Sequence, residues 1–272
     1  MPFRDRVPAL LALAIPVLAG ALYMALAGAP AHYALANLGA LAIACLWILG
    51  GRGPHTSLSR HLMTGVLLFT LLTPLAVSPE AISVTGDRVM RWFPLGSVNL
   101  HTGMLVAPAL CVLAARHRTL GAPILLAAIA CVWFQPDAAT GFALTFAAVG
   151  LHHVTRDWKV GAVAIAGFFA SINMALRGEL PPQPFVERVL VEAAGMSIFL
   201  AIALGLALAA SFALMLFAIP FDREKRFALA GLLFGFAVLA LMSTYPTPLI
   251  GYGASPILGF GLALGLHRIP KR

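Results

Sequence analysis

The chain has 272 residues, of which 61% are hydrophobic and 10% are charged. A soluble domain carries about 25% charged residues, so this composition excludes a water-soluble globular protein. The formal net charge of +8 does not indicate a nucleic-acid partner, because the basic residues lie in short gaps between apolar runs, where they set membrane topology.

Ten apolar runs follow one another along the chain, and each predicts a membrane-spanning helix. They cover residues 8–28, 33–50, 62–77, 100–115, 120–135, 138–154, 160–176, 189–217, 227–244 and 249–266. A spanning helix needs roughly 20 residues, and several runs are shorter, so eight or nine spans is the alternative count. The sequence therefore predicts an all-α fold, in which residues 1–272 form one polytopic membrane helix bundle of about ten transmembrane helices.

The charged residues divide between two sides when the N-terminus is placed in the cytoplasm. Fourteen of the 18 Lys and Arg residues then lie inside, which is the bias of an inserted membrane protein with both termini cytoplasmic. Most acidic residues lie outside: Glu80, Asp87, Asp137, Glu179, Glu187 and Glu192. This surplus of carboxylates makes the outer face the expected place for a functional site.

Four segments on that outer face are marked by proline, glycine or length: residues 78–103, 135–137, 177–195 and 244–256. Long, Pro-marked loops in a chain whose other connections are very short often carry function. These four segments are therefore the expected places for chemistry-bearing residues.

Asp137 and the dipeptide Arg91-Trp92 are the first candidates. An ionisable residue at a membrane boundary is costly and is a functional candidate by default. The structural alternative for Asp137 is a helix N-cap, and the two roles are compatible. Arg91 offers a bidentate fork for a phosphate, whereas Trp92 is also the residue type that anchors a chain at the membrane interface.

Glu187, Arg188 and Glu192 are the second group, on the segment that leads into the eighth run. Arg188 and Glu192 are spaced for an i to i+4 helix ion pair. Alternatively, a carboxylate here lies at the mouth of a membrane groove, where desolvation raises its pKa enough for general-base work.

Metal and redox chemistry have no signature in the sequence. Cys45, Cys111 and Cys131 all lie inside apolar runs. This is the expected place for free cysteines, which behave as small buried hydrophobic residues. No Cys/His spacing indicates a metal, so we expect no metal site. The first run is predicted to be a span and not a cleaved signal peptide.

Four motifs together resemble the SEDS family, the FtsW/RodA/SpoVE group of cell-wall polymerases. Arg91-Trp92-Phe-Pro-Leu-Gly96 is similar to the RW-x-x-LG element of the family, and Gln135-Pro-Asp-Ala-Ala-Thr140 to its QPDLGT element. Pro184 to Gly195 is similar to DFIFAVLAEELG, and Pro248 to Ser255 to PF(I/V)SYGGSS. The four motifs occur in family order and on one face.

The resemblance implies a ten-helix bundle in the bacterial inner membrane that polymerises lipid II outside the cell membrane. The substrate would be a polyprenyl-diphosphate-linked glycan held at the lipid surface, and the usual partner is a class B penicillin-binding protein. No organic cofactor is implied, although a divalent cation is one way to neutralise the diphosphate. A base is needed near the acceptor hydroxyl.

The chain departs from the family pattern at the positions where the family has its catalytic residues. Pro184 stands where the essential Asp of the family begins its third motif, and Ala107 stands where a Lys belongs. The candidate catalytic bases are therefore Asp137 and Glu187, the second of which lies about one helical turn beyond Pro184. The resemblance assigns substrate binding to the remaining polar and aromatic residues of the motifs: Arg91, Trp92, Gln135, Arg188, Glu192 and Tyr252.

Three functional hypotheses follow from these observations. The first is an active lipid-linked glycosyltransferase with a relocated base. The second is a non-catalytic scaffold that binds the penicillin-binding protein or a polyprenyl-diphosphate lipid. The third is a transporter or flippase of a lipid-linked precursor. The spans contain almost no charged residues, and this disfavours a transporter that works by a charge relay.

Overall fold

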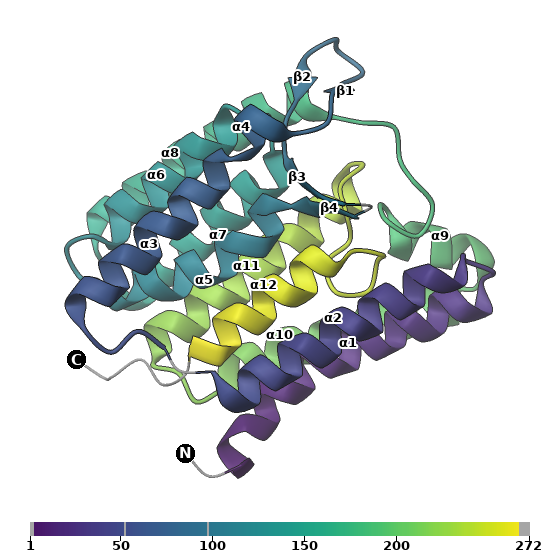
Figure 1. The fold of residues 1–272 in the computed structure, drawn as a ribbon, viewed down its shortest axis with the longest axis horizontal. Helices are drawn as coiled ribbons and strands as arrows, with labels where there is room; N and C mark the ends of the chain where they lie inside the picture. The colour runs from purple at the N-terminus through teal and green to yellow at the C-terminus, as the bar shows by residue number, and fades with distance from the viewer. Residues whose placement is uncertain (1–2, 52, 97, 267–272) are drawn as a thin grey trace.

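The computed structural model describes residues 3–51, 53–96 and 98–266 and shows a helix bundle with two short β-hairpins at one end (Figure 1). Arg52, Arg268, Lys271 and Arg272, which we expected on the inner side, lie outside the described residues. The longer helices are α1 (Val7–Leu26), α2 (Ala31–Gly50), α3 (Ser57–Leu72), α5 (Thr102–Arg116), α6 (Gly121–Trp133), α7 (Ala138–Thr155), α8 (Trp158–Gly178), α10 (Ile198–Ala213), α11 (Arg223–Met242) and α12 (Ala254–Gly265). Short helical elements are a 3-10 turn (Phe3–Arg6), α4 (Pro74–Val77), α9 (Val189–Met196) and a π-helical turn (Leu214–Ala218).

The two hairpins are an addition to the predicted all-α bundle, and both lie in the segment expected to be a loop. Strands β1 (Ala81–Ile82) and β2 (Arg88–Val89) pair antiparallel, as do β3 (Trp92–Leu95) and β4 (Val98–His101). Gly96 takes a φ of 61° at the tip of the second hairpin, a conformation that glycine adopts without strain. Trp92 pairs with His101 across it, so this hairpin delivers His101 to the start of α5.

The apolar runs coincide with helices, with two differences. The run 189–217 is broken at Ser197, whose φ of −162° and ψ of 127° are extended, and it forms α9 and α10. The run 249–266 becomes helical only at Ala254, because residues 249–253 form a loop. Asn37 on α2 holds that loop by donating to the Gly251 carbonyl (2.9 Å) and accepting from the Gly253 N–H (3.0 Å).

The chain is a multi-pass helical membrane protein, but the count of ten spans is not confirmed. Within the described residues, six helices are long and apolar enough to cross a membrane. Three shorter apolar helices, α5, α6 and α12, have 15, 13 and 12 residues. Helix α5 is buried on all sides from Thr102 to Ala115 apart from Leu105, so it lies in the centre of the protein and needs little contact with lipid.

Helices α5, α7, α11 and α12 form the middle of the bundle, with α3, α6 and α8 on one side and α1, α2 and α10 on the other (Figure 1). Small residues allow close approach at the centre. A Cβ on Gly231 of α11 would meet the Phe146 carbonyl of α7, and one on Gly259 of α12 would meet the Met104 carbonyl of α5. The hairpins and α9 lie at the opposite end of the bundle from the 3-10 turn, as the two-sided charge pattern predicts (Figure 1).

Candidate functional site

The fold brings two of the four outer segments, residues 177–195 and 244–256, into contact through main-chain bonds. The Tyr252 N–H donates to the Phe185 carbonyl (2.7 Å), and the Thr247 N–H donates to the Val186 carbonyl (2.9 Å). Glu187 forms an isolated antiparallel bridge with Pro246. The loop that carries Glu187 is therefore fixed against the loop that precedes α12.

Asp137 is fully buried and is the N-cap of α7, the structural role weighed for it from the sequence. Its Oδ1 accepts the Thr140 N–H (3.2 Å), whereas Oδ2 has no hydrogen-bond partner in the described part of the protein. As described, the carboxylate is closed off from substrate. It therefore acts on the chemistry of the outer face only through its neighbours.

His101 is the residue that faces Asp137, with its Nε2 3.6 Å from Asp137 Oδ1. The Met104 N–H donates to His101 Nδ1 (3.3 Å), so the proton of a neutral ring lies on Nε2, toward Asp137. Burial lowers the pKa of His101, with Asp137 opposing that effect and Arg91 adding to it. Sequence reasoning missed His101; the available signal was a titratable residue directly before an apolar run on the same face as Asp137.

Arg91 is buried and occupied by protein groups. Its Nη2 donates to the Gly178 carbonyl, and its guanidinium lies 5.4 Å from the Trp92 ring centroid and 5.1 Å from that of Tyr245. The Arg91 guanidinium, which we expected to bind a phosphate, is thus not exposed at the surface. It connects the hairpin to the end of α8. Burial raises the pKa of Tyr245 to about 12, with Arg91 opposing that rise. Nothing in the sequence pointed to Tyr245.

Gln135 is also buried, with its Nε2 donating to the Leu71 carbonyl at the end of α3. Its Oε1 has no partner within the described residues. This amide therefore joins α3 to the turn before Asp137. We call Arg91, His101, Gln135, Asp137, Thr140 and Tyr245 the buried polar cluster.

Each member of the buried polar cluster has one buried polar atom without a hydrogen-bond partner in the described part of the chain. These atoms are Arg91 Nε, His101 Nε2, Gln135 Oε1, Asp137 Oδ2, Thr140 Oγ1 and the Tyr245 hydroxyl. An orphaned group costs about 1–3 kcal/mol, hence roughly 6–18 kcal/mol for the six. That sum is as large as the stability of a whole protein, about 5–15 kcal/mol. The cluster needs further partners.

Glu187 lies outside the buried polar cluster and is half-buried in the loop before α9. Its Oε2 accepts the Gln183 N–H (2.7 Å). Burial raises the pKa of Glu187 to about 7, against the opposing effects of the backbone N–H groups and of Arg91, whereas nearby Glu192 adds to the rise. The carboxylate therefore exchanges its proton near neutral pH, as a general base should.

The predicted helix ion pair between Arg188 and Glu192 is wrong. Arg188 takes a φ of 53° ahead of α9, so it is not in regular helical register with Glu192. Glu192 Oε2 instead accepts the Phe185 N–H (3.2 Å) and stabilises the turn that precedes Glu187. The Arg188 side chain is exposed and has no ion-pair partner among the described residues.

The two aromatic candidates lie on either side of this region. Trp92 is half-buried, with its ring edge-on to His101 at 6.2 Å. Tyr252 stacks on Tyr33 of α2 with ring centroids 3.8 Å apart, and His32 meets both rings edge-on. Trp92 therefore covers the buried polar cluster, whereas Tyr252 closes the loop against α2.

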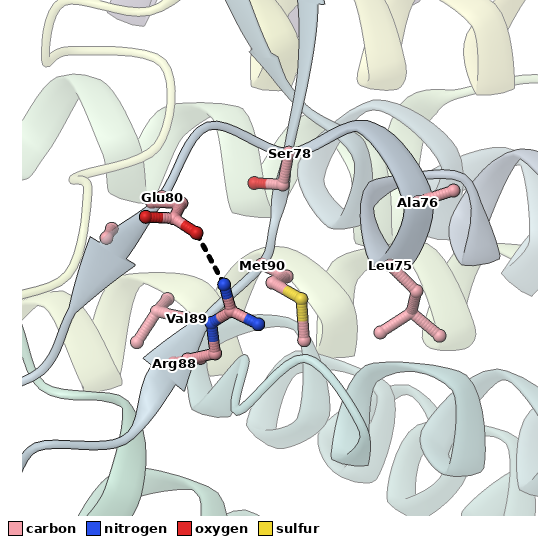
Figure 2. A pocket seen from close by; sticks show the side chains of 8 residues that line it. Leu75, Ala76, Ser78, Glu80, Arg88, Val89 and Met90 are labelled. Carbon is pink, nitrogen blue, oxygen red and sulfur yellow. Dashed lines mark hydrogen bonds and ion pairs between the residues drawn. The ribbon is translucent and has the colours of Figure 1, made fainter.

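Two hollows lie away from the buried polar cluster. One of about 240 Å³ lies beneath the first hairpin, where Arg88 is ion-paired with Glu80 and both side chains are largely exposed (Figure 2). The other, of about 380 Å³, is lined by residues of the inner end, including Arg118, Asp157 and Glu224. No group of three or more His, Cys, Asp or Glu side chains that could hold a metal ion occurs in the described ranges.

Comparison with solved structures finds the same fold elsewhere. No protein-family profile matches the chain, and no curated protein matches it. A chain in the structure titled "Structural coordination of polymerization and crosslinking by a peptidoglycan synthase complex" is similar, with a TM-score of 0.55 and 21% sequence identity. The match covers 95% of this chain and 96% of that chain. At this identity the similarity establishes the shared fold.

Proposed function

We propose that the protein is a SEDS-like glycosyltransferase of the bacterial inner membrane that uses polyprenyl-diphosphate-linked glycan at the outer face. The observation that carries the proposal is Glu187, a carboxylate with a pKa of about 7 next to Arg188, which is exposed and has no ion-pair partner in the described part of the chain. The two side chains supply a base and a cation on one loop. The fold shared with a chain of a peptidoglycan synthase complex supports the choice of substrate class.

The reaction needs one proton acceptor and stabilisation of one leaving group. The acceptor hydroxyl gives its proton to the Glu187 carboxylate, and its oxygen forms a bond to the anomeric carbon. The bond from that carbon to the diphosphate oxygen breaks, and the diphosphate leaves with the electron pair. Arg188, with its planar fork of N–H donors, is the residue proposed to bind the diphosphate.

The buried polar cluster has a supporting role in this proposal. Arg91 acts electrostatically on both Glu187 and His101, so its charge influences the Glu187 loop as well as the buried polar cluster. Asp137, the second candidate base, is enclosed by protein and is a positioning residue. A divalent cation remains an addition to the proposal, and no step depends on it.

The second candidate function is a non-catalytic scaffold that binds a class B penicillin-binding protein or a polyprenyl-diphosphate lipid. The observation in its favour is the enclosure of Arg91 and Asp137, which leaves Glu187, Arg188 and Glu192 as the accessible charged candidates of the motifs. Movement of a lipid-linked precursor across the membrane is the third candidate.

Polymerisation of lipid II by the purified protein in detergent tests the proposal. We expect glycan ladders from the wild type and their loss in Glu187→Gln, since a general base contributes about 10²–10⁴-fold to rate. The matched control is Glu80→Gln, which removes an exposed outer carboxylate in the first hairpin and should leave the ladders unchanged. Absence of ladders from the wild type, while a known active polymerase produces them, would replace this proposal with the scaffold.

A further inference from the structure

The unpartnered atoms of the buried polar cluster lie close together. His101 Nε2 lies 3.6 Å from Asp137 Oδ1. A Cβ built on Gly103 would overlap both Thr140 Oγ1 and Asp137 Oδ2, so these two oxygens lie together against the same point of α5. The Arg91 guanidinium lies 5.1 Å from the Tyr245 ring and is tied to Gly178, whose own Cβ would meet the Pro136 carbonyl. The orphaned groups therefore share one region and are not scattered defects.

The orphaned atoms also complement one another chemically. Arg91 Nε and His101 Nε2 are donors, because a guanidinium has no acceptor and the His101 proton lies on Nε2. Gln135 Oε1 and Asp137 Oδ2 are acceptors when the carboxylate is ionised. The hydroxyls of Thr140 and Tyr245 can do either. Within the described residues His101 Nε2 approaches Asp137 Oδ1 only to 3.6 Å, and Arg91 interacts with the Tyr245 side chain, but none of the six atoms completes a hydrogen bond of ordinary geometry. A partner that serves both the donors and the acceptors must itself donate and accept.

Water is the partner that fits this combination. A water molecule typically forms about three hydrogen bonds to buried groups that are otherwise unsatisfied. A metal or alkali cation would serve only the oxygens and would leave Arg91 Nε and His101 Nε2 without partners. It would also add a second positive charge to a buried group that contains the Arg91 guanidinium and the Asp137 carboxylate, which is costly.

We propose that the buried polar cluster holds a chain of ordered water molecules that bridge its unpartnered atoms. This inference rests on the geometry of the buried polar cluster and does not require glycosyl transfer.

Radiolytic labelling of the full-length protein in H₂¹⁸O, read by mass spectrometry, tests the proposal without any substrate. Tyr245 and Phe260 are both fully buried, but only Tyr245 belongs to the buried polar cluster. We expect ¹⁸O on Tyr245 and background labelling on Phe260, since hydroxyl radicals form from water held next to a side chain. Equal background labelling of the two residues would overturn the proposal.

A pair of threonine variants sharpens the test. Thr140→Val removes an orphaned hydroxyl of the buried polar cluster at nearly constant volume, and we expect it to lower the labelling of Tyr245. Thr145→Val is the matched control on the same helix, because the Thr145 hydroxyl is buried but already donates to the Gly141 carbonyl (2.9 Å). Equal labelling of Tyr245 in both variants and the wild type would show that Thr140 binds none of this water and would contradict the proposed chain.

Discussion

The raised pKa of Glu187 predicts that replacing this residue by glutamine stabilises the protein at alkaline pH. In the unfolded chain the carboxyl ionises near 4.5, whereas in the folded protein it ionises near 7. Between these values the unfolded state loses its proton first, so wild-type stability falls as pH rises from 4.5 to 7 and is level above that. The variant Glu187→Gln would carry no such penalty, and its amide keeps an oxygen for the Gln183 N–H.

The size of the effect follows from the same interval. At about 1.36 kcal/mol per pH unit, the interval between the unfolded and folded pKa values of Glu187 corresponds to a loss of roughly 3 kcal/mol in the free energy of unfolding. Because Glu187 is partly exposed, solvent screening reduces this to roughly 1–2 kcal/mol. Thermal unfolding in detergent should therefore give Glu187→Gln a melting temperature a few degrees above wild type at pH 8, with little difference at pH 4.5.

The control for this measurement is Glu80→Gln, because Glu80 is an exposed carboxylate on the same outer face. We expect no comparable gain at pH 8 in this variant. If Glu187→Gln shifted the melting temperature equally at pH 4.5 and pH 8, burial of the ionised carboxylate would not be the cause. The reasoning that assigns Glu187 as the base would then lose its physical support.

Three further predictions concern activity and local stability. If Glu187 acts as its carboxylate, the polymerisation rate should fall about tenfold per pH unit below 7, and a flat profile from pH 5 to 8 would contradict that role. Asp137→Asn retains the N-cap, so thermal unfolding should show it about 0.5–2 kcal/mol more stable than Asp137→Ala. Asn37→Ala removes both bonds to the loop 249–253, and hydrogen exchange at Gly253 should rise relative to wild type.

The sequence was sufficient to locate the helices and to place the motif segments at one end of the bundle. A bilayer requires about 20 apolar residues per span, so runs and helices coincide because one physical requirement produces both. The N-cap role of Asp137 was also readable, since it depends on a bond to Thr140 only three residues away. Local patterns failed where a broken helix intervened, as with Arg188 and Glu192, because the left-handed conformation of Arg188 could not be foreseen.

The buried polar cluster could not be predicted because its members come from distant parts of the chain. His101 reaches Asp137 only after the second hairpin and α7 pack against α5, and Tyr245 meets Arg91 across more than half the sequence. Such contacts depend on how helices pack, which neither periodicity nor motif spacing records. The motifs placed Arg91 among the outer segments but did not indicate that its side chain is buried.

The main-chain bonds that fix the Glu187 loop have an evolutionary consequence. Any residue except proline can donate the N–H that Thr247 and Tyr252 supply, and any residue can offer the carbonyls of Phe185 and Val186. The side chains around Glu187 can therefore drift without moving it. A loop held in this way keeps its geometry through many substitutions of its side chains.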